Sequence, residues 1–126
     1  MPSDPARILL VEDEPLISMM TAELLDDAGF AVVEAATAGE AMRKLTDRFA
    51  AAIIDLGLPD QPGQVLTRAV RQQWPAMPVV VASGRDRHEV ATVFADDDKV
   101  AAISKPYDIT MLLDALRALG VPVPDA

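Results

Sequence analysis

Carboxylates directly follow two of the most apolar stretches of this chain. Glu12 and Asp13 follow the run Ile8–Val11, and Asp55 follows the run Ala51–Ile54 just before a turn. Two like charges about 4 Å apart repel by roughly 4 kcal/mol at an effective dielectric constant near 20. If the fold brings these acids together, a hard divalent cation would relieve the repulsion. Mg²⁺ is the first candidate, because it takes oxygen ligands and accepts substrate phosphate.

A hydroxyl and an ammonium follow two further apolar runs. Ser83 follows the β-branched run at 79–81, and Lys105 follows the run at 100–103. A carboxylate held beside a divalent cation and an ammonium acts as a nucleophile towards a phosphoryl group, because both cations neutralise charge on the transferred oxygens. The residue types therefore predict phosphoryl transfer to Asp55.

Alternation of apolar runs with helical patterns indicates how these side chains meet. We expect strands over residues 8–11, 31–33, 51–54, 79–81 and 100–103, each followed by a helix. Near-continuous apolar strands alternating with helices are typical of a parallel sheet covered on both faces. In such a sheet, sites form outside the carboxyl ends of the strands, where all the polar residues above lie.

Helix signals support this α/β alternation. Pro15 suits a first turn and Gly29 a stop, Thr37 and Glu40 have capping-box spacing, and Asp108 suits a cap of the last helix. The third helix should end before Pro75. The expected apolar faces are, in chain order, Leu16, Ile17, Met20 and Leu24; Ala38, Ala41, Met42 and Leu45; Leu66, Ala69 and Val70; Val90, Val93 and Phe94 in a fourth helix capped by Asp86 or Glu89; and Leu112, Leu116 and Leu119.

Composition bounds the class of protein. The chain has 126 residues, no cysteine and a formal net charge of −9, which indicates one acidic domain without disulfides. An acidic chain is poorly suited to bind nucleic acid directly, and no segment has the pattern of a secretory signal or a membrane span. We expect a cytoplasmic domain over residues 5–120, a short frayed tail over 121–126, and no output domain in this chain.

The motifs RILLVEDEP, DLGLPDQPG, PVVVASG and ISKP, in this order, strongly resemble the receiver domain of bacterial two-component response regulators. The resemblance covers nearly the whole chain. It implies a doubly wound (βα)5 fold of the flavodoxin-like type, with a five-stranded parallel sheet in the order 2-1-3-4-5. The alternation of strands and helices does not by itself fix this order, so the order is an implication of the resemblance.

The resemblance also assigns roles to individual residues. Asp55 would be the phosphoacceptor, and Glu12 and Asp13 would hold Mg²⁺, or another divalent cation such as Mn²⁺, together with Asp55 and the backbone carbonyl of Gly57. Ser83 would be the switch hydroxyl and Lys105 the ionic partner of the phosphoryl group. Pro106 would set the local turn through a cis bond.

One position departs from the family pattern. Receivers usually carry Tyr or Phe three residues before the lysine, and this chain has Ala102. Without that ring the usual output route is missing, so signalling would run through loop movements near Gly84 and Arg85, or the domain would only hold and pass on phosphate. Arg85 and Gly57 occupy positions that tune phosphoryl lifetime in the family.

The resemblance implies a signalling domain that catalyses its own phosphorylation and dephosphorylation, and not an enzyme acting on a separate metabolite. The donor would be a sensor histidine kinase or a histidine phosphotransfer protein, and the downstream protein target is unknown. The last helix and the fifth strand are candidate surfaces for partners or for a homodimer. No direct contact with nucleic acid or membrane is expected.

Other classes fit the residues less well. A flavin- or nucleotide-binding protein needs a Gly/Ser/Thr-rich loop after the first strand, where this chain has three acids. A metal-dependent phosphatase with an Asp nucleophile needs a second Asp at position 57, which is Gly57. A receiver-like scaffold that works without phosphate would be expected to lack Asp55, an acidic-pair residue or Lys105, and all are present.

Simple structural roles explain the remaining conspicuous residues. Glu14 is read as an acid favoured at a helix N-terminus, and His88 as a solvated helix residue, because a lone histidine makes no metal site. Asp96, Asp97 and Asp98 are read as a solvated loop. Trp74 is expected to pack at an edge, and the methionines of the first two helices are expected to pack in the core.

Overall fold

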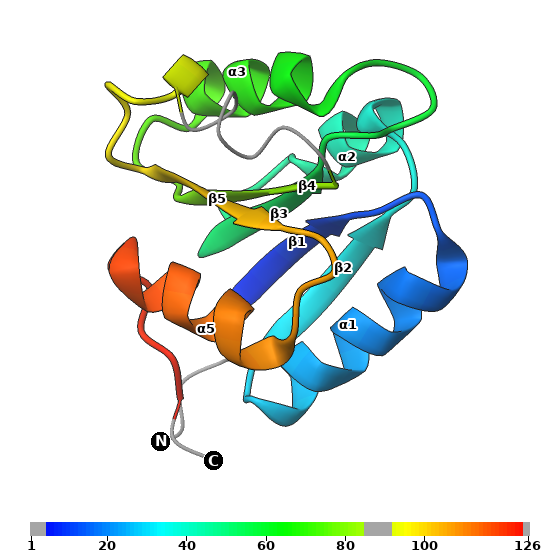
Figure 1. Cartoon of the computed structure of the whole chain (residues 1–126), viewed down its shortest axis with the longest axis vertical. Coiled ribbons are helices and arrows are strands. Elements are labelled where there is room, and N and C mark those ends of the chain that lie inside the picture. Colours follow the sequence, from blue (N-terminus) through cyan, green and yellow to red (C-terminus); the bar gives the residue numbers. More distant parts are fainter. Residues whose placement is uncertain (1–4, 85–91, 125–126) are drawn as a thin grey trace.

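Five parallel strands form one sheet in the order β2-β1-β3-β4-β5 in the computed structural model, which describes residues 5–84 and 92–124 (Figure 1). The strands are β1 Arg7–Val11, β2 Ala31–Ala35, β3 Ala51–Asp55, β4 Val79–Ser83 and β5 Val100–Ser104. The predicted α/β class and strand order are therefore confirmed. Asp55 and Ser83 are the last residues of their strands, so these two candidate residues belong to the sheet itself.

Helices cover both faces of the sheet. The described helices are α1 Pro15–Asp27, α2 Ala38–Lys44, α3 Gly63–Gln73 and α5 Ile109–Ala118. Figure 1 shows α1 and α5 against one face, and α2 and α3 against the other. The expected fourth helix lies largely outside the described residues, as do Arg85 and His88. No helix in the described ranges has the length and apolar character needed to cross a bilayer.

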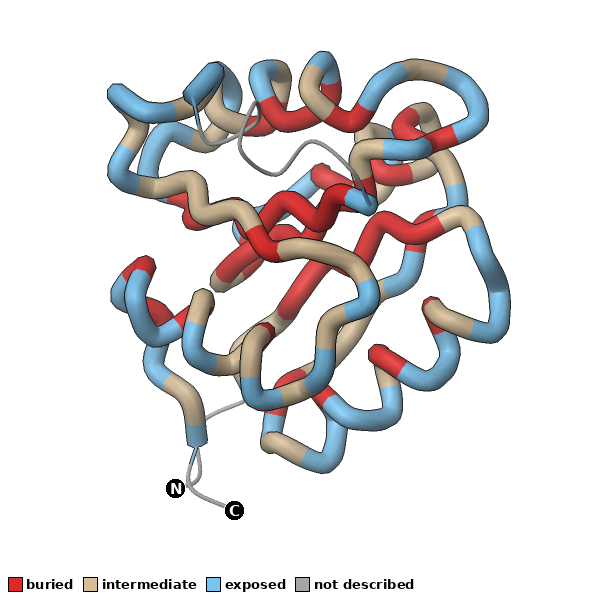
Figure 2. Tube along the Cα trace, in the orientation of Figure 1, coloured by how far each residue is buried: buried red, intermediate tan, exposed pale blue. Residues whose placement is uncertain are grey.

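The core consists of two clusters, one on each side of the sheet (Figure 2). Successive residues of a strand point to opposite faces. Leu9 and Ile54 therefore join the first cluster, under α2 and α3, while Leu10 and Ile53 join the second, under α1 and α5. This two-sided burial explains why the central strands are continuously apolar in sequence.

The predicted caps of two helices are present. The Thr37 hydroxyl accepts a hydrogen bond from the Glu40 amide at 3.0 Å, and the Asp108 carboxylate accepts one from the Met111 amide at 2.8 Å. The Glu40 carboxylate reaches back to the Ala36 amide, one residue before the cap, at 2.6 Å. These bonds satisfy amides that have no partner inside the helix.

The apolar stripe predicted for α1 does not face the core, and this prediction is wrong. Leu16 and Met20 are 64% and 53% exposed, whereas Ser18 and Thr21 are buried. The buried hydroxyls have polar partners: Ser18 donates to the Glu34 carboxylate at 2.6 Å, and Thr21 bonds to the Tyr107 hydroxyl at 3.3 Å. The helix packs on the sheet through Ser18, Thr21 and the fully buried Leu25, so the predicted stripe is left largely towards solvent.

The methionine prediction is correct for one of the helices only. Met42 on α2 is half-buried against the first cluster, as expected. Met19 and Met20 on α1 are exposed, so they are not core residues. Together with Leu16 and Leu24, they form a surface that we call the α1 ridge.

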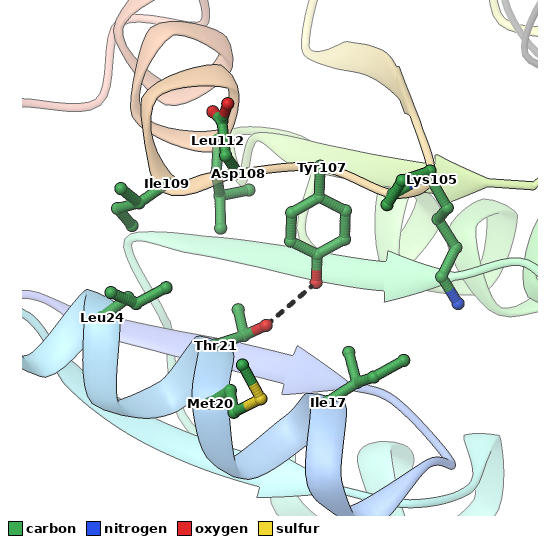
Figure 3. A pocket seen from close by; sticks show the side chains of 10 residues that line it. Ile17, Met20, Thr21, Leu24, Lys105, Tyr107, Asp108, Ile109 and Leu112 are labelled. Atoms are coloured by element: carbon green, nitrogen blue, oxygen red, sulfur yellow. Dashed lines mark hydrogen bonds between the residues drawn. The ribbon is translucent and has the colours of Figure 1, made fainter.

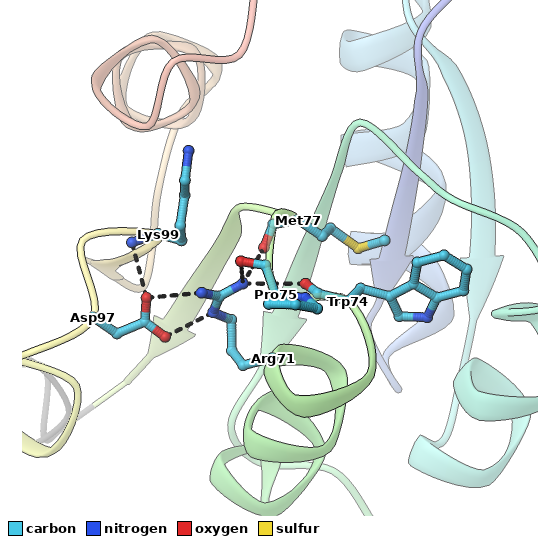
Figure 4. Close-up of polar contacts among 6 residues, drawn as sticks. All are labelled: Arg71, Trp74, Pro75, Met77, Asp97 and Lys99. Atoms are coloured by element: carbon cyan, nitrogen blue, oxygen red, sulfur yellow. Dashed lines mark hydrogen bonds and ion pairs between the residues drawn. The ribbon is translucent and has the colours of Figure 1, made fainter.

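Asp97 is not part of a solvated loop, unlike the exposed Asp96 and Asp98. Its carboxylate pairs with the Arg71 guanidinium at 2.6 and 3.0 Å (Figure 4). Arg71 also donates to the carbonyls of Trp74, Pro75 and Met77. The hydrogen bonds from Arg71 lower the pKa of Asp97. We call this group the Arg71–Asp97 clamp. Trp74 packs at the edge of the first cluster, as predicted.

The described part of the tail packs against the core, which differs from the expectation of fraying. Val121 is buried in the second cluster, and its amide bonds to the Leu116 carbonyl at 2.9 Å. Pro124 lies so close to Gly29 that a Cβ added to Gly29 would meet it at 2.8 Å. Gly29 itself has φ of 102°, a conformation that favours glycine.

Candidate functional site

Three carboxylates converge at the carboxyl ends of β1 and β3, which are neighbours in the sheet. Val11 pairs with Ile54, so the residues that follow, Glu12 and Asp55, emerge side by side. One oxygen each from Glu12, Asp13 and Asp55 lie within 4.8 Å of one another. Glu12 is 3% exposed and Asp55 6%. The prediction that the sheet brings these acids together is confirmed.

Lys105, from the carboxyl end of β5, completes the cluster. Its Nζ lies 3.4 Å from Glu12 Oε1 and 3.3 Å from Asp55 Oδ1. The Lys105 amide donates to the Ser83 carbonyl at 2.8 Å. This bond ties to β4 the start of the loop between β5 and α5, which we call the Lys105 loop. The peptide bond between Lys105 and Pro106 is cis, as predicted. One ammonium is therefore shared between two buried carboxylates.

Burial sets the charge state of the acidic group. Burial, with a smaller contribution from the neighbouring Asp55 charge, raises the pKa of Glu12 to about 7; the Glu14 amide, which donates to its carboxylate, and Lys105 only partly offset this. Burial alone would lower the pKa of Lys105, but Glu12 and Asp55 outweigh it and raise that pKa above its usual value. The lysine is therefore charged at neutral pH, while Glu12 is near its titration midpoint.

Ser83 ends β4, the strand that pairs with β3. It is the buried last residue of β4, and it directly follows Ala82, the pairing partner of Asp55. Ala102 on β5 pairs with Val81 and packs, half-buried, against the first hydrophobic cluster of the core. The sheet thus places Ser83 on the strand next to Asp55, and it places the methyl group of Ala102 beside Val81.

The loop from Asp55 to Gly63, which we call the acceptor loop, is closed at its base. The Gly63 amide donates to the Leu56 carbonyl at 3.0 Å, and the Gly57 amide donates to Asp55 Oδ1 at 3.2 Å. A Cβ on Gly63 would lie 2.5 Å from the Asp55 carbonyl oxygen. The final glycine of DLGLPDQPG is therefore required by close approach of two backbone segments.

Sequence reasoning did not identify Asp60 as a structural anchor of this loop. Its carboxylate accepts from the Ala38 and Gly39 amides at 3.0 and 2.9 Å, at the start of α2. These hydrogen bonds lower the pKa of Asp60. Asp60 lies 22 positions after Ala38 and 21 after Gly39, so no local sequence pattern predicts the contact.

The donor set of the cluster fits a hard divalent cation. All three converging side chains offer carboxylate oxygens, the ligands that Mg²⁺ and Mn²⁺ prefer over sulfur. With Glu12 ionised, three carboxylates face one ammonium, and the excess negative charge matches a divalent ion. Glu14, exposed just before α1, is outside this group, as expected.

An apolar groove of about 190 Å³ adjoins the site between α1 and the start of α5 (Figure 3). Ile17, Met20 and Leu24 line it from α1, and Ile109 and Leu112 line it from α5. Lys105 and Tyr107 lie on the connecting loop, and Tyr107 bonds across the groove to Thr21. The groove and the α1 ridge form a continuous apolar surface, because they share Met20 and Leu24.

Comparisons with known proteins agree with the geometry. The family model described as the response regulator receiver domain matches residues 8–117. Transcriptional regulatory protein PhoP of Escherichia coli is 35% identical over 118 residues, which are 90% of this chain and 51% of that protein. Sensor protein TorS of Escherichia coli is 38% identical over 79 residues, 61% of this chain and 9% of that protein.

A solved structure shows the same architecture. A CheY-like receiver domain protein of Methanospirillum hungatei superposes with a TM-score of 0.82 at 31% identity, covering 90% of this chain and 91% of that one. The chain therefore matches nearly all of an isolated receiver but only about half, or less, of the two curated relatives described above.

Proposed function

This chain belongs to the response regulator receiver family, and we propose that it accepts a phosphoryl group on Asp55 in a Mg²⁺-dependent reaction and changes conformation in response. The observation that carries this proposal is the position of Asp55: it is buried at the end of β3, in contact with Lys105 and beside the oxygens of Glu12 and Asp13. The proposed receiver unit is residues 5–120.

In the proposed reaction, an Asp55 carboxylate oxygen attacks the phosphorus atom of the donor. A P–O bond to Asp55 forms while the bond from phosphorus to the donor breaks, and the donor leaves with that electron pair. Lys105 contributes fixed positive charge next to the attacking carboxylate, and Ser83 offers a hydroxyl from the neighbouring strand. Glu12, Asp13, Asp55 and the Gly57 carbonyl would hold Mg²⁺, which supplies charge neutralisation for the phosphoryl oxygens.

A sensor histidine kinase or a histidine phosphotransfer protein is the proposed donor, and the cytoplasm is the proposed location. The α1 ridge supports a protein donor, because it places exposed apolar side chains beside the groove that Lys105 lines. A donor that delivers a phosphoryl group to Asp55 must approach this rim of the sheet. Apolar contact there would hold it in place, with charges at the periphery.

Replacing one ridge residue should separate protein donors from small ones. We expect Met20→Lys to slow phosphoryl transfer from a histidine kinase about tenfold, the effect of losing roughly 1.4 kcal/mol of interface energy. Transfer from acetyl phosphate should be unchanged. The measurement is the rate of phosphoryl transfer from an autophosphorylated kinase that phosphorylates the unmodified chain. Val65→Lys is the matched control, because Val65 is also exposed but lies on α3, on the opposite face. Equal slowing by both variants would contradict a docking role.

The proposed function itself is tested with intact-protein mass spectrometry after incubation with acetyl phosphate, with and without Mg²⁺. We expect a gain of one phosphoryl group that requires Mg²⁺ and is lost in Asp55→Asn. Asp96→Asn, at an exposed acid that is not among the converging carboxylates, should behave as the unmodified chain does. No gain, or an equal gain in Asp55→Asn, would favour a receiver-like scaffold that operates without phosphate.

Ala102 favours a second form of the same function. Where the family pattern has an aromatic ring at this position, this chain has a methyl group on β5. A receiver that holds and passes on phosphate with weak switching would fit that replacement. The proposed readout is the amide spectrum of the chain with and without phosphorylation: changes confined to the acceptor loop and the Lys105 loop indicate weak switching.

A further inference from the structure

The N-terminus of α2 is satisfied by a carboxylate from a distant segment. In a helix the first amides lack partners within the helix itself. Here the Thr37 hydroxyl accepts a hydrogen bond from the Glu40 amide. The two Asp60 oxygens accept hydrogen bonds from the amides of Ala38 and Gly39. Asp60 belongs to the acceptor loop, so the three N-terminal amides of α2 are shared between a local cap and a long-range one.

The two capping residues, Thr37 and Asp60, differ in the segments that they connect to α2. Thr37 is local to α2, and its bond to Glu40 spans three residues. Asp60 lies five residues after Asp55 and three after Gly57, between the buried Leu58 and the loop closure at Gly63. α2 in turn is held to the core by Ala38 and Ala41, which belong to the same cluster as Leu58. The helix is therefore a fixed platform for the tip of the acceptor loop.

We propose that Asp60 is a positioning residue, which fixes the acceptor loop on α2 so that Gly57 and Asp55 are preorganised for the divalent cation. This role rests on the proposed function. Two successive amides each donate to a different Asp60 oxygen, so the bonds define the direction of the carboxylate as well as its location. Partners that orient metal-binding groups contribute to affinity without touching the ion.

The test compares Mg²⁺ affinity with loop order in the metal-free chain. We expect Asp60→Ala to weaken Mg²⁺ binding about tenfold in calorimetry, the low end for loss of an outer-shell partner. Amide hydrogen exchange at Gly57 and Leu58 should be faster in metal-free Asp60→Ala than in the unmodified chain. Thr37→Ala, which removes the other cap from the same helix end, should leave both quantities close to those of the unmodified chain.

Asp60→Asn separates positioning from long-range charge. Asparagine removes the charge but keeps one acceptor oxygen, so positioning predicts an affinity between those of Asp60→Ala and the unmodified chain. Equal losses in Asp60→Asn and Asp60→Ala would assign the effect to charge and overturn the proposal. So would weakened binding in Thr37→Ala to the same extent, because the effect would then belong to α2 as a whole.

Failure of this role is distinguishable from failure of the proposed function. Normal Mg²⁺ binding by both the unmodified chain and Asp60→Ala would overturn the role of Asp60 alone. Absence of Mg²⁺ binding by the unmodified chain would overturn the metal-dependent function and this role with it.

Discussion

We expect Gly63→Ala to lower the free energy of unfolding by about 3 kcal/mol, the upper part of the usual range for overpacking a buried position. The added Cβ would lie 2.5 Å from the Asp55 carbonyl oxygen and 2.6 Å from the Leu56 Cα. Both are backbone atoms, so relief requires α3 to move away from the end of β3. That movement strains the hydrogen bond from the Gly63 amide to the Leu56 carbonyl.

Helix propensity alone predicts that Gly63→Ala raises the free energy of unfolding, so the measurement distinguishes the two effects. Gly63 is the first residue of α3, and alanine is favoured over glycine within helices by up to about 1 kcal/mol. The measurement is urea unfolding of the two proteins. Gly84→Ala serves as the control, since nothing lies within 4 Å of a Cβ added there. A Gly63→Ala variant as stable as the unmodified chain would mean that the close approach relaxes without cost.

Without divalent cations, we expect the chain to become less stable by about 2 to 3 kcal/mol as pH rises from about 4.5 to above 7, the linkage expected for one carboxyl group with a raised pKa. Between these limits the folded protein keeps a proton on Glu12, whose pKa is raised to about 7, whereas the unfolded chain has lost it. The contribution is fully present below pH 4.5 and is lost as pH rises through 7. Saturating Mg²⁺ should reverse the trend, because it binds the ionised carboxylate.

Urea unfolding at pH 5 and pH 8, with and without Mg²⁺, measures this effect. Glu12→Gln should remove most of the difference between the metal-free curves, while Glu23→Gln, an exposed acid on α1, should leave it intact. The lowered pKa values of Asp60 and Asp97 affect stability below this pH window, and the raised pKa values of Lys105 and Tyr107 affect it above the window. Metal-free stability that rises from pH 5 to pH 8 would contradict the assignment.

The strands and the grouping of polar residues at their ends were predictable, because an apolar run indicates a strand and the polar residue after it indicates where the strand ends. A strand buried on both faces is continuously apolar, and the first polar residue after it marks its carboxyl end. Glu12 was located in this way, whereas Lys105 comes directly after Ser104, the polar last residue of the half-buried strand β5. Asp55 and Ser83 were also located, although the structure extends their strands to include them.

The errors share one physical cause, which is pairing between distant residues. Periodicity gives α1 an apolar stripe, but its inner side carries Ser18 and Thr21, whose hydroxyls find partners in the distant Glu34 and Tyr107. Asp97 looks like one of three solvated acids until Arg71 is placed beside it. Asp60 likewise has a role only once α2 lies next to the acceptor loop. No local pattern contains these contacts.

The Arg71–Asp97 clamp has a consequence for the edge strand that it precedes. β5 consists largely of small residues, so side-chain packing alone resists a one-residue slip along β4 only weakly. Asp97 anchors the chain shortly before β5, and Lys105 anchors it immediately after, through Glu12 and Asp55. A slipped strand would have to break one anchor or the other. The ion pairs of Lys105 thus also help to hold the edge strand in register and to protect it against mispairing.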